Sequence, residues 1–137
     1  MRKRTLAREY AVQVLYQVDI TKDNFDDSLA NFWLAQESPT EETIKEFTHA
    51  LVKGTLENSS EIDKRLSQYA NNWQLKRMAV VDRNILRLGC YELVFRDDIP
   101  PKVAINEAVD LAKKYSGPEA GKFVNGILDK VKSEKNK

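Results

Sequence analysis

The chain has 137 residues, 42% of them hydrophobic and 31% charged, a balance typical of a folded globular domain and not of a disordered or membrane-embedded chain. With one cysteine, one histidine and no Gly-rich phosphate loop, the sequence lacks the usual residues for a disulfide, a zinc site or His-based catalysis, so we expect no cofactor, no metal and no enzyme activity. The net charge of +1 is unevenly distributed along the chain. Ten acidic and three basic residues give −7 between Lys22 and Asp63, which leaves +8 for the rest of the chain. The rest can therefore present a positive face to nucleic acid.

Four helices are predicted in the first half of the chain. The first starts near Thr5, a suitable N-cap residue, and carries apolar residues at helical spacing. The second covers about residues 25–37, and Thr40 is the expected cap of the third. A short helix over about residues 59–69 follows. Asn71 and its neighbour then form the expected seam between two halves of the chain.

Three more helices are predicted in the second half. A long helix over about residues 75–95 is apolar on most sides, which is typical of the central helix of a bundle. Gly89 inside it costs up to about 1 kcal/mol in helix propensity, so we expect a neighbouring helix to approach closely there. Helices over about residues 102–115 and 118–131 follow. The pattern therefore predicts an all-α fold with about seven helices.

A basic cluster at the start of the chain is the first candidate for function. Arg2, Lys3 and Arg4 precede the first helix, and Arg8 lies one turn further on. Arginine can bind phosphates through two hydrogen bonds and stack on bases, which suits single-stranded RNA. Such clusters are common, so this one indicates RNA binding only weakly. It also resembles the start of a signal peptide, but the sequence after it is amphipathic, and no apolar run reaches the roughly 18 residues that span a bilayer. We expect a cytoplasmic protein without membrane contact.

The polar face of the first helix carries two apolar residues one turn apart. At 100° per residue, Val12 and Tyr16 lie almost opposite the apolar stripe, on the face of Arg8, Glu9 and Gln13. An exposed apolar pair suggests a surface for a protein partner. Isolated exposed apolar residues are also normal, and another helix could cover these two. Both interpretations stay open.

Two residue pairs in the second half allow both a functional and a structural interpretation. Lys122 and Phe123 lie near the start of the last helix, where they could offer a phosphate contact and a stacking ring. Phe123 could equally belong to the core, and Glu119 would repel phosphate. Asp82 and Arg83 interrupt an apolar helix, so they form an internal salt bridge or dock a partner.

Three ordered blocks of the second half resemble the NusB family of bacterial transcription antitermination factors. The blocks are Val80-Val81-Asp82-Arg83-Asn84-Ile85-Leu86-Arg87-Leu88-Gly89 with Tyr91-Glu92-Leu93, then Pro101-Lys102-Val103-Ala104-Ile105-Asn106-Glu107-Ala108-Val109 with Leu111-Ala112-Lys113, and finally Lys122-Phe123-Val124-Asn125-Gly126-Ile127-Leu128-Asp129. The first half is similar more loosely, through the basic start and Arg8-Glu9-Tyr10-Ala11-Val12-Gln13-Val14-Leu15-Tyr16. The resemblance covers essentially the whole chain.

The resemblance implies an all-α fold of two packed helical subdomains, here residues 1–71 with the basic arm and residues 72–137. It also implies a function. Members of the family bind the boxA element of nascent RNA together with NusE, which is also a small-subunit ribosomal protein. With other Nus factors on RNA polymerase, the pair favours continued transcription, notably of ribosomal RNA operons.

The resemblance also assigns residues to each surface. RNA contacts are expected at Arg2, Lys3, Arg4, Arg8, Gln13, Lys122 and Phe123. The partner surface is expected to include Tyr16 and Asp82, to which the sequence pattern adds Val12 and Arg83. Two features depart from the family pattern: the arm is short, and Gly121 replaces the usual small polar residue before the Lys-Phe pair.

Two other classes of function are alternatives to an RNA-binding adaptor. Similar helical domains occur fused to RNA cytosine methyltransferases, but this sequence leaves no room for a methyl-donor-binding α/β domain. A purely structural helical module would tolerate neutralisation of Arg2, Arg4 and Arg8. A homodimer that hides the RNA surface is compatible with the sequence, as is a monomer.

Overall fold

The computed structural model describes residues 2–70 and 72–135, and this part of the chain forms eight helices and no strand. The helices are α1 (Lys3–Thr21), α2 (Phe25–Leu34), α3 (Glu42–Glu57), α4 (Ser59–Ser67), α5 (Asn72–Arg77), α6 (Val80–Phe95), α7 (Pro101–Ser116) and α8 (Pro118–Lys135). The predicted all-α fold is confirmed. None of the helices in these residues is both long enough and apolar enough to cross a membrane.

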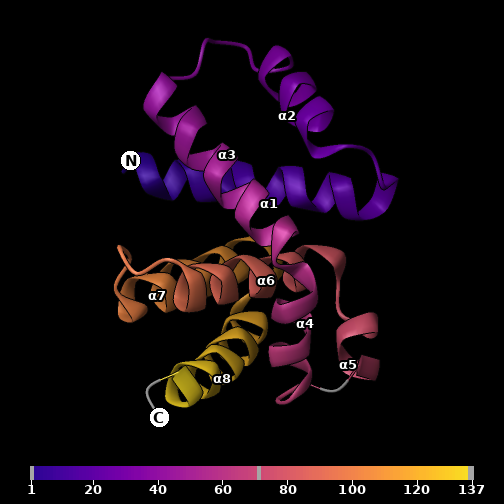
Figure 1. Cartoon of the computed structure of the whole chain (residues 1–137), viewed down its shortest axis with the longest axis vertical. Coiled ribbons are helices and arrows are strands. Elements are labelled where there is room, and N and C mark those ends of the chain that lie inside the picture. Colours follow the sequence, from indigo (N-terminus) through magenta and orange to yellow (C-terminus); the bar gives the residue numbers. More distant parts are fainter. Residues whose placement is uncertain (1, 71, 136–137) are drawn as a thin grey trace.

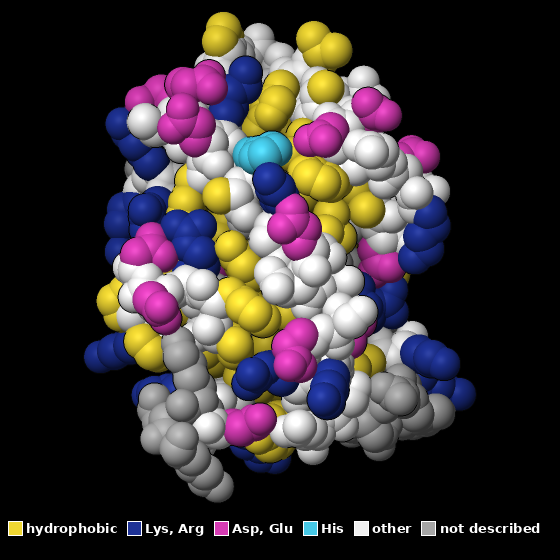
Figure 2. Space-filling view, viewed as in Figure 1, with side chains coloured by type: hydrophobic (Ala, Val, Ile, Leu, Met, Phe, Trp, Pro, Cys, Tyr) yellow, Lys and Arg dark blue, Asp and Glu magenta, His cyan; other side chains and the backbone are white. Residues whose placement is uncertain are grey.

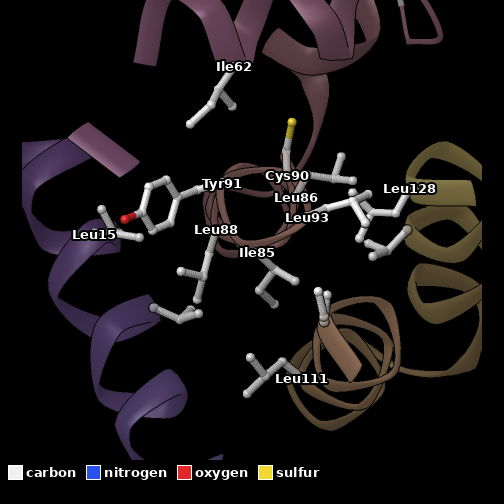
Figure 3. Packing of buried hydrophobic residues seen from close by; sticks show 14 of the residues in the cluster. Leu15, Ile62, Ile85, Leu86, Leu88, Cys90, Tyr91, Leu93, Leu111 and Leu128 are labelled. Carbon is white, nitrogen blue, oxygen red and sulfur yellow. The ribbon is translucent and has the colours of Figure 1, made fainter. Parts of the chain in front are cut away.

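Helix α6 is the central element of the fold. In Figure 1, α1, α2 and α3 lie at one end of the molecule, α4, α5, α7 and α8 lie at the other, and α6 runs between them. It packs against α1, α3, α4, α7 and α8. Viewed along its axis, α6 is ringed by Leu15 of α1, Ile62 of α4, Leu111 of α7 and Leu128 of α8 (Figure 3). The prediction of a central helix that is apolar on most sides is confirmed.

Two glycines allow helices to approach α6 closely. A Cβ atom on Gly89 would lie 2.8 Å from Cδ1 of Leu128 and 3.1 Å from Cβ of Ala108, so the close approach expected at Gly89 is confirmed. Gly54 of α3 plays the same part without having been predicted, because a Cβ atom there would overlap the ring of Tyr91. Tyr91 projects from α6 and is buried, so its ring cannot move freely aside.

We expect Gly54→Ala to lower the free energy of unfolding by about 1–3 kcal/mol, the usual cost of overpacking a core. Gly126 of α8 is the matched control, since a Cβ atom there meets nothing within 4 Å. Gly126→Ala should be neutral, or stabilising by up to about 1 kcal/mol from helix propensity. Urea unfolding of both variants measures the difference. Equal stabilities would show that the crossing of α3 over α6 is looser than the structure has it.

The predicted long helix over residues 75–95 is wrong at its start. Helix α5 ends at Arg77 and α6 begins at Val80, because Ala79 between them is extended, with φ −53° and ψ 139°. In a continuous helix the amide of Ala79 would donate to the carbonyl of Leu75. Instead, Nη1 of Arg83 donates to that carbonyl at 3.4 Å. A side chain thus satisfies the acceptor, and the described residues form one helix more than predicted.

Two predicted helix caps are also wrong. Helix α1 begins at Lys3, ahead of Thr5, whose hydroxyl instead donates to Oε1 of Glu107 at 2.7 Å. Helix α3 begins at Glu42 with Glu41 at the cap position, one residue after Thr40. The division into residues 1–71 and 72–137 stays a prediction, and Asn71 lies outside the described residues.

Candidate nucleic-acid interface

The basic arm lies on the surface, as expected for Arg2, Lys3 and Arg4. Figure 2 shows Lys and Arg side chains gathered at the edge of the molecule around the amino end of α1. The arm is not free of acidic partners, since Nζ of Lys3 lies 2.9 Å from Glu41. The Arg4 guanidinium lies 4.3 Å from the centre of the Phe47 ring. Both contacts lie at the surface. An exposed ion pair contributes little free energy, so these side chains can give up their present partners for a phosphate.

Arg8, by contrast, is a core residue with 2% of its surface exposed. Its Nε and Nη2 donate to Glu92 of α6 at 2.9 and 2.7 Å, and its Nη1 donates to Glu107 of α7 at 3.3 Å. Burial raises the pKa of the Glu92 carboxyl, and the hydrogen bonds from Arg8 oppose that rise. The expectation that Arg8 contacts RNA is therefore wrong for this structure: its guanidinium ties three helices together.

Val12 is also buried, which corrects its assignment to a partner surface. The helical wheel assumed that the face opposite the apolar stripe meets solvent. In the fold that face turns toward α6 and α7, as the contacts of Arg8 and the ion pair between Glu9 and Lys114, 2.6 Å apart, show. Tyr16, one turn beyond Val12, remains 42% exposed. Ile20 follows one turn later and is also exposed, although the pattern did not single it out.

The Asp82-Arg83 pair separates into two different contacts. Arg83 forms a salt bridge with Asp19 of α1, with Nη2 2.8 Å from Oδ2, so the internal salt bridge is the correct interpretation for Arg83. Asn84 donates to the same oxygen at 3.1 Å. Burial alone would raise the pKa of Asp19, but hydrogen bonds from Arg83 and Asn84 outweigh it and hold the pKa at about 2. Asp82 accepts a hydrogen bond from the Ser116 hydroxyl at 2.6 Å, near the turn between α7 and α8.

Lys122 and Phe123 both face solvent on the first turns of α8. The Lys122 side chain is exposed, with its Nζ 3.5 Å from Glu119, and Phe123 is 38% exposed. Val124, the next residue, is fully buried and supplies the core contact. Phe123 is therefore not a core residue, and its ring is accessible to a ligand.

Gln13 joins this region from α1. Its Nε2 donates to the hydroxyl of Tyr115 at 3.2 Å, and Tyr115 lies in the last turn of α7, just before the turn into α8. We call the region formed by Gln13, Tyr115, Lys122 and Phe123 the α7–α8 corner. Tyr115 is exposed, and the sequence did not predict it as a site residue. Only its position at the end of a predicted helix could have indicated such a role.

The predicted RNA residues thus form two groups. The basic arm lies beside the start of α7, where Arg2 and Arg4 line a shallow hollow of about 190 Å³ with Pro100 and Val103. The α7–α8 corner lies at the other end of α7, which at 16 residues is about 24 Å long. Cations at both ends of α7 can neutralise phosphates, and the exposed rings of Tyr115 and Phe123 at the corner can stack on unpaired bases.

Comparison with known proteins gives consistent matches over nearly the whole chain. The model of the NusB family matches residues 5–133. The transcription antitermination protein NusB of Anaeromyxobacter dehalogenans is 47% identical over 131 residues, which cover 96% of this chain and 91% of that protein. The NusB protein of Desulfitobacterium hafniense is 48% identical over 134 residues, covering 98% of this chain and 90% of its own.

Solved structures also match over nearly the whole chain. The structure of NusB from T. maritima is 39% identical with a TM-score of 0.85, covering 96% of this chain and 91% of that one. A chain in the crystal structure of the antitermination factors NusB and NusE in complex with double-stranded RNA is 32% identical with a TM-score of 0.88. That match covers 98% of each chain.

Proposed function

Because the chain belongs to the NusB family, we propose that it is a transcription antitermination factor that binds boxA RNA together with NusE. It acts in the cytoplasm by recognition and not by catalysis. With other Nus factors on RNA polymerase, the pair supports continued transcription of ribosomal RNA operons. The two helical subdomains, residues 1–71 and 72–137, belong to the same proposal.

The exposed Lys122-Phe123 pair is the observation in this chain that carries the proposal. A solvent-facing aromatic ring beside a cation is the usual arrangement of a site for single-stranded nucleic acid, because every base offers a face for stacking and every phosphate a charge. Further support comes from the similar structure of NusB with NusE and RNA.

The RNA surface combines the α7–α8 corner with the basic arm. Arg2, Lys3, Arg4 and Lys122 neutralise phosphates, and Phe123 stacks on a base. Gln13 contributes a polar contact between the two groups. Arg8 acts indirectly, because its bonds to α6 and α7 fix the first turns of α1 that carry the arm.

The NusE surface lies beside the RNA surface. Tyr16 and Ile20 offer exposed apolar area on α1, and Asp82 offers a carboxylate next to the α7–α8 turn. An exposed aromatic ring with an apolar neighbour is a usual anchor of a protein interface. Continuity between the two surfaces lets NusE complete the RNA site.

A titration of boxA RNA against the purified chain, with and without NusE, tests the proposal. We expect weak binding by the chain alone and tighter binding once NusE is added, with an RNA of scrambled sequence bound less well in both cases. Molecular mass is measured in the same samples, because a homodimer could cover the RNA surface. Equal affinity for both RNAs, unchanged by NusE, would overturn the proposal.

Removal of the acidic partner of Lys122 should strengthen RNA binding. Glu119 lies 3.5 Å from Lys122 and is exposed, so Glu119→Gln frees the ammonium group and removes a charge that repels phosphate. Exposed charges of this kind contribute up to about 1 kcal/mol, so we expect a gain in affinity of about two- to fivefold at low salt. Glu61→Gln on the exposed face of α4 is the control. The same gain in both variants would place the RNA away from Lys122.

A further inference from the structure

Lys113 lies across the start of α8, in contact with a glycine. It belongs to the last turn of α7, and its aliphatic stem packs over Gly121, the residue directly before Lys122. A Cβ atom on Gly121 would lie 2.7 Å from Cγ of Lys113, 3.3 Å from Cε and 3.5 Å from Cδ. Gly121 is buried beneath this stem, whereas Lys113 as a whole is exposed. The lysine therefore reaches the α7–α8 corner through space that a side chain at residue 121 would also occupy.

Three lysines lie in or next to the α7–α8 corner, and they differ in the partners of their charges. Lys114 lies 2.6 Å from Glu9, and Lys122 lies 3.5 Å from Glu119. Within residues 2–70 and 72–135, no carboxylate lies within 4.0 Å of the Lys113 ammonium. Of these three lysines, Lys113 is thus the one whose charge is not already offset by an acidic side chain of the described residues.

We propose that Lys113 is a phosphate-binding residue of the RNA site and that Gly121 positions it. The inference rests on the proposed function and adds to it a contact that the sequence pattern did not assign. A side chain at residue 121 would push the Lys113 stem away from α8 and with it the ammonium group. Gly121 thus allows this chain to place a second lysine over the start of α8, next to the residue that precedes Lys122.

Two single variants and their combination test the inference in the complex with NusE. Removal of one phosphate contact with single-stranded RNA reduces the slope of log affinity against log salt by about 0.7, which is a loss of about fivefold at 0.1 M salt. We expect Lys113→Gln to show this loss. Gly121→Ser should lower the affinity in the same direction, because it displaces the intact lysine. In the Lys113→Gln background, Gly121→Ser should have little further effect.

Lys64→Gln on α4 is the control for the loss of one positive charge, and it should leave the affinity and its salt slope unchanged. Thermal unfolding and NusE binding of each variant separate loss of RNA contact from loss of fold. Provided that the wild-type complex binds boxA RNA, either of two results would overturn the inference. One is an unchanged RNA affinity of Lys113→Gln, and the other is full additivity of the two substitutions. Absence of RNA binding by the wild-type complex would instead refute the proposed function.

Discussion

Replacing Arg8 with alanine is expected to lower the free energy of unfolding by about 3–5 kcal/mol, because it leaves two buried carboxylates without their cationic partner. The Arg8 guanidinium is the group that Glu92 and Glu107 share, at 2.7 and 3.3 Å, and all three side chains are almost fully buried. A loss of this size is a large part of the 5–15 kcal/mol that stabilises a typical domain. The variant should therefore unfold at markedly lower urea concentration, or fail to fold.

Arg4→Ala is the matched control, one turn earlier on α1. Its side chain is 56% exposed and its nearest carboxylate, that of Asp98, is 3.9 Å away, so its loss should change stability by no more than about 0.5–1 kcal/mol. At temperatures where both variants are folded, Arg4→Ala should bind RNA more weakly than Arg8→Ala, because only Arg4→Ala loses a phosphate contact. If Arg8→Ala were as stable as Arg4→Ala and bound RNA less well, Arg8 would face the RNA, as the sequence pattern predicts.

Phe123→Ala is expected to weaken boxA binding by the complex with NusE by about 1–3 kcal/mol, the usual contribution of one aromatic–base stack. That is a loss of about 5- to 150-fold in affinity. The ring is 38% exposed, so truncation removes contact area for RNA while Val124 keeps the core closed. Fluorescence anisotropy of labelled RNA measures the loss.

Leu34→Ala on α2 is the control for the removal of an exposed apolar side chain, since Leu34 is 83% exposed and lies away from α7 and α8. It should bind boxA RNA like the wild type. Thermal unfolding of Phe123→Ala shows whether the chain is still folded at the temperature of the titration. If the folded Phe123→Ala variant bound boxA RNA as tightly as the wild type, Phe123 would not stack on a base.

The periodic features of the sequence predicted the helices well, and tertiary contacts account for the failures. The all-round apolar pattern of residues 80–95 identified the central helix, because each of its sides meets a neighbour. The pattern did not predict the break before Val80, where the carbonyl of Leu75 accepts a hydrogen bond from Arg83 in place of a backbone amide. No local pattern contains that contact.

The first helix shows why the site was harder to predict than the fold. A helical wheel states which residues share a face but not what the face meets. Arg8 is bonded to residues 84 and 99 positions away in the chain, and these acidic partners turn a presumed RNA contact into a core ion pair. Val12 on the same face is also buried, while Tyr16, one turn further along α1, stays exposed. The contact of Lys113 with Gly121 joins two helices and is equally invisible in the sequence.

Hydrogen exchange in the complex with NusE, with and without boxA RNA, tests most directly whether the α7–α8 corner is where RNA binds. We expect the RNA to slow amide exchange over residues 113–124 and in the first turn of α1, and to leave α4 unchanged. Slower exchange in α2 or α4, with residues 113–124 unaffected, would contradict the proposed site and place the RNA on another face.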